Sequence, residues 1–146
     1  MLVIGHHHHD EAFIAFIDAG VLAKVALLLG GLVRLHVAAE GAAVEILDIK
    51  DASDAVNEIR AAGGQANAEL CDVTSEEQIA KAVAAIAARH DHVDILVNNA
   101  GILSGKTPWH ELSYDEVNRF VQVNYLGYFL VSKAIYPLLK KSEHGR

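Results

Sequence analysis

The sequence predicts an α/β fold, a three-layer sandwich in which helices cover both faces of a parallel sheet of about four strands. Two observations predict it. Short apolar runs recur along the chain, and segments whose apolar residues repeat at helical spacing lie between them. The apolar runs end close to glycine, asparagine or aspartate, which favour turns. Strands that alternate with helices form βαβ units with right-handed crossovers.

The first half of the predicted sheet lies between residues 25 and 48. The apolar run from Val25 to Leu29 ends at Gly30-Gly31 and is typical of a strand buried on both faces. The run 43–48 predicts the next strand. A helix should follow from about Ser53 to Ala62, where Gly63-Gly64 would terminate it.

The second half begins with a third strand at 66–70. Thr74-Ser75-Glu76-Glu77 fits a capping box and opens the next helix. A fourth strand is predicted at 95–98, followed by a loop. Ser113-Tyr114-Asp115-Glu116 is a second capping box, which opens a long helix that ends at about Leu139.

Composition restricts the classes of function. At 146 residues the chain is long enough for one domain with a sizeable core. A hydrophobic content of 52% argues against a disordered chain. The net charge of −7 argues against nucleic acid as a partner, because phosphate binding needs a basic surface. The single cysteine, Cys71, excludes an internal disulfide and fits a cytoplasmic protein. No membrane span is expected, since the most apolar stretch, 12–33, contains charged residues.

The most informative motif is the turn Asn98-Asn99-Ala100-Gly101, which follows the fourth apolar run. The asparagines supply amide donors and acceptors at the end of a strand, and Ala100-Gly101 lets another molecule approach the backbone. Ligands of open α/β sheets bind beyond the carboxyl ends of the strands. An ordinary strand-to-helix turn is the alternative, and motifs elsewhere in the chain favour the ligand-binding interpretation.

Two such motifs are Cys71-Asp72-Val73-Thr74 and Val123-Asn124-Tyr125-Leu126-Gly127. With the asparagine turn, they make the chain resemble the short-chain dehydrogenase/reductase family from about Lys24 to Arg146. The resemblance implies a Rossmann-like sheet of order 3-2-1-4 and an NAD(P)-dependent oxidoreductase acting on a small-molecule alcohol or carbonyl substrate. It also implies a homo-oligomer. Residues 23–146 are therefore expected to form a partial Rossmann dinucleotide-binding domain.

Residues 1–22 fall outside this resemblance and are expected to form a separate N-terminal segment that can be flexible. The segment contains the run His6 to His9, which looks like a metal handle. Four adjacent histidines cannot all face one metal from a regular element. We therefore interpret the run as a tag-like or incidental tract and expect no native metal site.

The cofactor implied by the resemblance is a nicotinamide dinucleotide. A Rossmann fold places an acid at the end of its second strand, where it accepts hydrogen bonds from the adenosine ribose and repels a 2′-phosphate. Asp48 has that position and favours NAD over NADP; a capping or solvated aspartate is the alternative. The resemblance implies adenine contacts for Asp72 and Val73. It also implies that Asn98, Ala100 and Gly101 line the side of the site that faces the adenosine ribose and the nicotinamide.

The glycine-rich turn of the family is broken in this chain. Glycines after the first strand normally let backbone N–H groups reach the pyrophosphate. Gly30 fits the first position of the family spacing Gly-x-x-x-Gly-x-Gly, but Arg34 and His36 stand at the other two. An alignment on Gly41 leaves the same two glycines missing. We interpret Arg34 as an exposed helix residue, and we expect cofactor binding by this chain to be weak or absent.

A catalytic role for Asn124 is also implied, as the asparagine of an Asn-Ser-Tyr-Lys tetrad that holds a water in a proton relay. A helix–helix hydrogen bond is the alternative. The family's Tyr-x-x-x-Lys pair belongs to a later helix that the 146 residues do not include. Tyr136 and Lys140 have this spacing, but they share the helix of Asn124, which Pro137 should kink or end. We interpret their spacing as chance.

Two functions therefore remain open. The first is an N-terminal portion of an NAD(P)-dependent short-chain dehydrogenase/reductase that is catalytically incomplete, because the serine, tyrosine and lysine are missing. The second is a non-catalytic nucleotide-binding or assembly module on the same fold. In both, the fourth strand would lie at an open edge and the long helix would keep an uncovered apolar face. Self-association is therefore expected.

Overall fold

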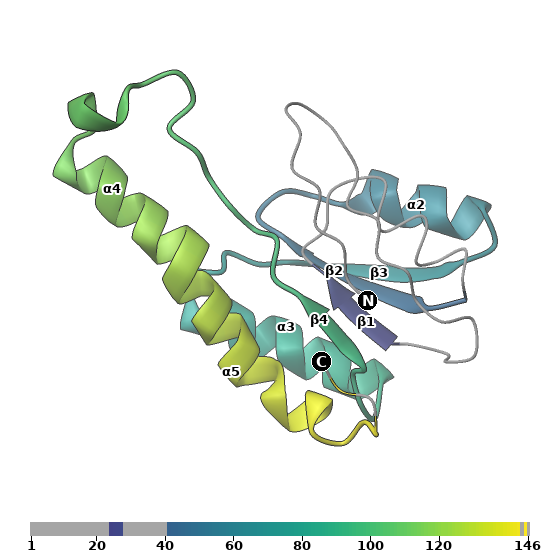
Figure 1. Ribbon diagram of the computed structural model, residues 1–146. Coiled ribbons are helices and arrows are strands. Elements are labelled where there is room, and N and C mark those ends of the chain that lie inside the picture. The colour runs from purple at the N-terminus through teal and green to yellow at the C-terminus, as the bar shows by residue number, and fades with distance from the viewer. Residues whose placement is uncertain (1–23, 28–40, 144, 146) are drawn as a thin grey trace.

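The computed structural model describes residues 24–27, 41–143 and 145. In these residues, parallel strands form one sheet with the spatial order β3-β2-β1-β4, which confirms the predicted order (Figure 1). The carboxyl ends of the strands meet at one end of the sheet, because all pairings are parallel. The strands are β1 (Lys24–Leu27), β2 (Ala43–Asp48), β3 (Gln65–Leu70) and β4 (Ile95–Val97).

Helices cover both faces of the sheet and complete three layers. Helix α2 lies on one face, and α3 and α5 lie on the other (Figure 1). Helix α4, the π-helical turn η2 and α5 follow one another without a break, so residues 114–139 form one long helical rod. The bounds are α2 (Ser53–Ala61), α3 (Glu76–Arg89), η1 (Trp109–Glu111, a 3₁₀ turn), α4 (Tyr114–Val121), η2 (Gln122–Leu126) and α5 (Gly127–Leu139).

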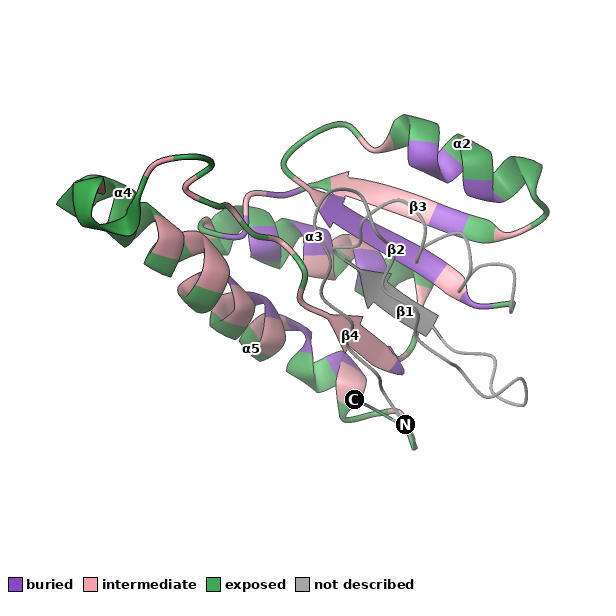
Figure 2. Ribbon diagram, turned by 45° about the horizontal axis from the view of Figure 1, so that its top comes forward, coloured by how far each residue is buried: buried purple, intermediate pink, exposed green. Residues whose placement is uncertain are grey.

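The sheet divides the hydrophobic core in two. Successive side chains of a strand point to opposite faces. Val44 and Ile46 of β2 therefore pack on the α2 side, where they meet Ile59. Leu47 points to the other side and joins a cluster built from α3 and α5. Figure 2 shows this core as buried segments of β2, α2, α3 and α5, whereas α4 has no buried residue.

A buried carboxylate also lies in the sheet. Glu45 is 2% exposed and points to the α3 side. It accepts hydrogen bonds from Nε and Nη2 of Arg89 at 3.1 and 2.7 Å, and from Nδ2 of Asn67 at 2.8 Å. Nε2 of His90 lies 2.7 Å from Oε1 of Glu45. Arg89 also pairs with Glu69 at 2.8 Å. The network ties β2 and β3 to the carboxyl end of α3.

The predicted start of the rod is confirmed. Oγ of Ser113 accepts a hydrogen bond from the Glu116 backbone N–H, and the Glu116 carboxylate accepts one from the backbone N–H of Ser113. At the other end, Pro137 lies inside α5, and the helix continues to Leu139. Among the described helices, none is both long and apolar enough to cross a membrane.

The start of α3 differs from the prediction by one residue. Ser75, and not Thr74, is the N-cap, and its Oγ accepts a hydrogen bond from the backbone N–H of Gln78. The hydroxyl of Thr74 donates instead to Asp72 at 2.7 Å. The capping box expected at 74–77 is therefore wrong, because the threonine is already engaged in the turn that precedes the helix.

Candidate functional site

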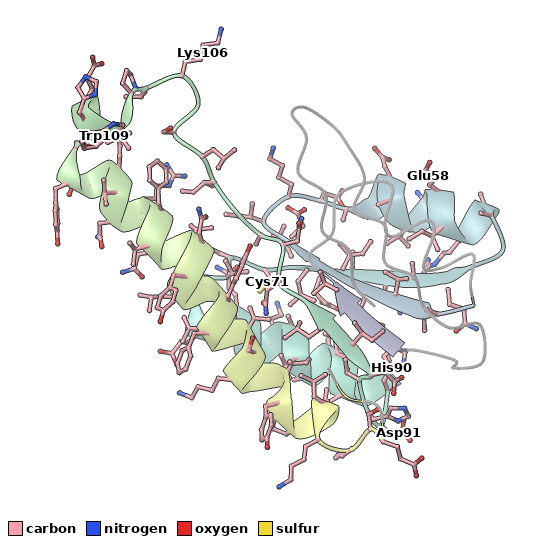
Figure 3. The ribbon with its side chains drawn as sticks, in the orientation of Figure 1. Glu58, Cys71, His90, Asp91, Lys106 and Trp109 are labelled. Atoms are coloured by element: carbon pink, nitrogen blue, oxygen red, sulfur yellow. The ribbon has the colours of Figure 1, made fainter. Side chains whose placement is uncertain are left out.

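A cleft of about 860 Å³ opens at the carboxyl ends of the strands. One wall consists of the segments that follow β2, β3 and β4, namely 48–50, 71–74 and 99–102. The opposite wall comes from the rod, through α4 and η2. Cys71, labelled in Figure 3, belongs to the strand-end wall. Open parallel sheets bind their ligands at this end.

Asp48 lies at the end of β2, where the sequence placed it, and lines the cleft. Its Oδ1 accepts a hydrogen bond from the backbone N–H of Lys50 at 2.9 Å. Among the described residues, none donates to its Oδ2. One carboxylate oxygen therefore orders the turn, and the second is available to a hydroxyl of a ligand.

Asp72 is held in the same manner at the end of β3. Its Oδ1 accepts hydrogen bonds from the backbone N–H and the hydroxyl of Thr74, at 2.9 and 2.7 Å. Its own backbone N–H donates to Oε1 of Gln78 at 2.9 Å. Val73 is buried next to it and also lines the cleft. The local hydrogen bonds thus fix a second carboxylate on this wall before any ligand arrives.

The turn after β4 divides its residues between the cleft and the core. Asn99, Ala100 and Gly101 line the cleft, whereas Asn98 does not. The Nδ2 group of Asn98 donates to Oγ of Ser132 on α5 at 3.0 Å. Its Oδ1 is buried and has no hydrogen-bond partner among the residues that the structure describes. Ser132 is half-buried, and its hydroxyl oxygen accepts this bond.

Asn124 lies in the π-helical turn η2 and is half-buried. Its Oδ1 accepts a hydrogen bond from the backbone N–H of Ile102, and its Nδ2 donates to the carbonyl of the same residue, both at 2.9 Å. The side chain therefore clamps the loop after β4 to the rod. These hydrogen bonds go to the backbone of a loop, whereas a helix–helix hydrogen bond was the alternative to a catalytic role.

Sequence reasoning missed the polar wall on the rod. Four of its lining side chains are Asp115, Asn118, Arg119 and Gln122. These positions repeat at intervals of three and four residues, so they share one side of a helix. This polar stripe was the available signal. The stripe did not indicate a ligand site by itself, because the solvent-exposed side of a helix is normally polar.

Cys71 is buried at the base of the strand-end wall. Burial, together with the negative charge of Asp72, raises the pKa of its thiol to about 11. A thiol that stays protonated at neutral pH is a poor nucleophile and a poor metal ligand. In the described part of the chain, no group of three His, Cys, Asp or Glu side chains could hold a metal ion.

Several residues that the sequence analysis discussed are not part of the described cleft. Gly30, Arg34 and the run His6 to His9 lie outside the described residues. Tyr136 is exposed near the end of α5, and neither it nor Lys140 lines the cleft.

Comparisons with known proteins match most of the chain. The short chain dehydrogenase family matches residues 29–146. Cyclopentanol dehydrogenase of Comamonas testosteroni is 37% identical over 130 residues, which cover 84% of this chain and 52% of that enzyme. The chain thus spans about half the length of this relative.

Two solved structures share the fold. A 3-ketoacyl-ACP reductase from Sinorhizobium meliloti 1021 has a TM-score of 0.71 and 33% identity, over 81% of this chain and 49% of that one. A metagenomic short-chain oxidoreductase in complex with NADP has a TM-score of 0.71 and 27% identity, over 84% of this chain and 59% of that one.

Proposed function

Because this chain belongs to the short-chain dehydrogenase family, we propose that its cleft binds the adenosine half of a nicotinamide dinucleotide. The protein would then contribute to an NAD(P)-dependent dehydrogenase or reductase that acts on alcohol or carbonyl groups. When bound, the nicotinamide ring would donate or accept the hydride. The residues of the cleft would bind and orient the nucleotide.

The observation that carries this proposal is the pair of carboxylates at neighbouring strand ends. Asp48 and Asp72 each keep one oxygen in a local turn and leave the other without a described donor. A ribose has hydroxyl donors and an adenine has an amino donor, so each free oxygen has a matching group on an adenosine. Ala100 and Gly101 add a wall of small residues that a flat ring could approach.

Within this site we assign the roles as follows. Asp48 would accept from the ribose hydroxyls, and Asp72 with Val73 would contact adenine. Ala100 and Gly101 would line the ribose on the nicotinamide side, with Asn98 behind them. Asn124 would hold this wall in place through Ile102 and would remain the candidate for the proton relay.

We propose NAD rather than NADP as the preferred cofactor, since a carboxylate at position 48 would repel a 2′-phosphate. The affinity should be weaker than micromolar, because two of the glycines that normally face the phosphates are replaced. The metagenomic short-chain oxidoreductase was solved in complex with NADP, so NADPH is the competing cofactor to test.

An amide NMR titration of the whole chain with NADH and with NADPH tests the proposal. NADH should shift the amides of residues 48–50 and 71–74 and should bind more tightly than NADPH. Asp48→Asn should weaken NADH binding by about tenfold, the equivalent of one charge-assisted hydrogen bond. Asp54→Asn, an exposed acid on α2 away from the cleft, is the matched control. A dissociation constant for NADH unaffected by Asp48→Asn would contradict the assignment.

A second function is a non-catalytic nucleotide-binding or assembly module. The described residues that line the cleft include no tyrosine. In a reductase of this family such a residue would donate the proton to the developing alkoxide. Incubation of the purified chain with NAD and a panel of secondary alcohols separates the two functions. Turnover that Tyr136→Phe abolishes would restore Tyr136 as a catalytic residue and exclude the second function.

A further inference from the structure

Gly127 is the first residue of α5 and is buried against the wall of the cleft. A Cβ atom at this position would lie 2.7 Å from Cγ2 of Val73 and 3.2 Å from its Cβ. Carbon atoms in proteins do not approach so closely, so a side chain at 127 would force Val73 or the helix to move. Val73 itself lines the cleft beside Asp72.

The backbone conformation of Gly127 does not require glycine. Its φ of −56° and ψ of −45° are ordinary right-handed helical values. Glycine is less favourable than alanine inside a helix, because it loses more conformational entropy. The short distance to Val73 is therefore the feature that explains the absence of a side chain.

The same stretch of the rod contacts both parts of the strand-end wall. Asn124 binds the backbone of Ile102 through two hydrogen bonds. Three residues later, Gly127 packs directly on Val73. The segment 124–127 thus connects the turn after β4 with the turn after β3, and its packing fixes their positions relative to the rod.

We propose that Gly127 is a positioning residue of the nucleotide cleft. Its missing side chain lets Val73 lie against the rod, and this contact keeps the adenine-facing side of the cleft open. A larger residue at 127 would push Val73 and the adjoining Asp72 toward the space that adenine would occupy. The inference rests on the proposed nucleotide-binding function.

The test is a double-mutant cycle on the whole chain, with the dissociation constant for NADH measured by amide NMR titration. Gly127→Ala should weaken binding by about fivefold or more, because overpacked contacts must be relieved by movement of the wall. Val73→Ala removes Cγ2, the nearest of the Val73 atoms that the new Cβ would meet, and leaves only the milder contact with the Val73 Cβ at 3.2 Å. The double variant should therefore bind NADH within about twofold of Val73→Ala alone.

A purely structural role would give a different pattern. Val56→Ala removes buried atoms on the α2 side of the sheet, remote from the cleft, and provides a destabilised control. It should lower the melting temperature and leave the dissociation constant unchanged. The proposal is overturned if Gly127→Ala binds NADH like the wild-type chain, or if Val73→Ala fails to rescue it.

Failure of the proposed function can be recognised separately. If the wild-type chain binds no NADH, the nucleotide-binding function is excluded, and the positioning role is then decided without ligand. Gly127→Ala should shift the amide resonances of residues 71–74 relative to the wild type. In the Val73→Ala background the same substitution should shift them much less. Amides at 71–74 that do not respond to Gly127→Ala would overturn the positioning role.

Discussion

At the scale of single residues, Glu45 is the least expected feature of the sheet, because it has an inward-facing position that apolar residues normally fill. Burial alone would raise the pKa of this carboxyl. Hydrogen bonds from Arg89, Asn67 and His90 outweigh burial, and the pKa lies below its usual range. Glu45 is therefore a charged group at neutral pH, and its stability in the core depends on Arg89 as the principal cationic partner.

Arg89→Ala should lower the free energy of unfolding by about 2–3 kcal/mol, because it leaves a buried carboxylate without its cation. The expected loss lies below that of a fully buried pair, since the Arg89 side chain is 32% exposed and Asn67 still donates to Glu45. Urea denaturation measures it. Lys81→Ala, an exposed position on the same helix, should change stability by less than about 0.5 kcal/mol. Equal losses in both variants would show that the network contributes nothing.

The same carboxylate predicts a pH dependence. A group whose folded-state pKa is lowered stabilises the protein above its unfolded-state pKa, and this contribution is lost as pH falls through the folded-state value. Stability should therefore decline as the pH falls from about 5, through the ordinary glutamate pKa of about 4.3 and on to the lowered folded-state pKa of Glu45. Glu45→Gln, which cannot titrate, should show a shallower decline in denaturation experiments between pH 7 and 3. Parallel curves for the two proteins would contradict this expectation.

At the scale of elements, the sheet and most helices could be predicted from the sequence. The bounds of β2 agree with the apolar run 43–48, because turn residues flank that run on both sides. The π-helical turn could not be predicted, since one wider turn leaves no distinct signal in the composition of the sequence 122–126. The cap of α3 was misplaced by one residue because Thr74 and Ser75 are both good caps.

The candidate site was predictable only on its strand side. Strand ends in a parallel sheet converge at one edge, so Asp48, Asp72 and Ala100 could be brought together from their places in the sequence alone. The contribution of the rod depends on how a long helix crosses the sheet, which no local pattern determines. The position of Arg119 in the cleft and the close contact between Gly127 and Val73 both depend on this crossing, so the sequence did not predict them.

Asn124→Ala should release the loop after β4 from the rod. Both hydrogen bonds to Ile102 disappear, and the amide of Ile102 should exchange with solvent at least about tenfold faster. The free energy of unfolding should fall by about 1–3 kcal/mol, because the loop backbone loses a donor and an acceptor. Hydrogen exchange followed by NMR measures the local effect. The matched control, Asn57→Ala on the exposed side of α2, should leave Ile102 unchanged.

At the scale of the whole molecule, two surfaces favour contact with another protein. Strand β4 lies at the edge of the described sheet, and unpaired edges invite pairing. The rod also exposes large apolar side chains along its length. Those with the largest exposed fractions are Tyr114 at 81%, Tyr125 at 69% and Phe129 at 61%. We therefore propose that the chain self-associates through the rod. The loop that carries Lys106 and Trp109 projects away from the sheet at the far end of this helical surface (Figure 3).

Sedimentation at tens of micromolar should show a dimer or larger species. Phe129→Lys places a charge on the apolar surface of the rod and should shift the distribution toward the monomer. Leu103→Lys, a control on the loop before α4, removes an apolar side chain that is more exposed than Phe129 and should have no effect on association. A wild-type chain that sediments as a monomer at this concentration would exclude association through the rod.

The π-helical turn has the effect of one inserted residue in an otherwise α-helical rod. Each residue advances an α-helix by about 100°, so the insertion changes the rotational phase between the two halves of the rod. With this phase, α4 presents Asn118 and Arg119 to the cleft while α5 buries Val131 and Ile135 against the sheet and α3. Deletion of one residue from 122–126 would give the rod regular α-helical geometry throughout and rotate one half away from the surface that it now contacts. The π-helical turn thus allows one half of the rod to line the cleft while the other half packs in the core.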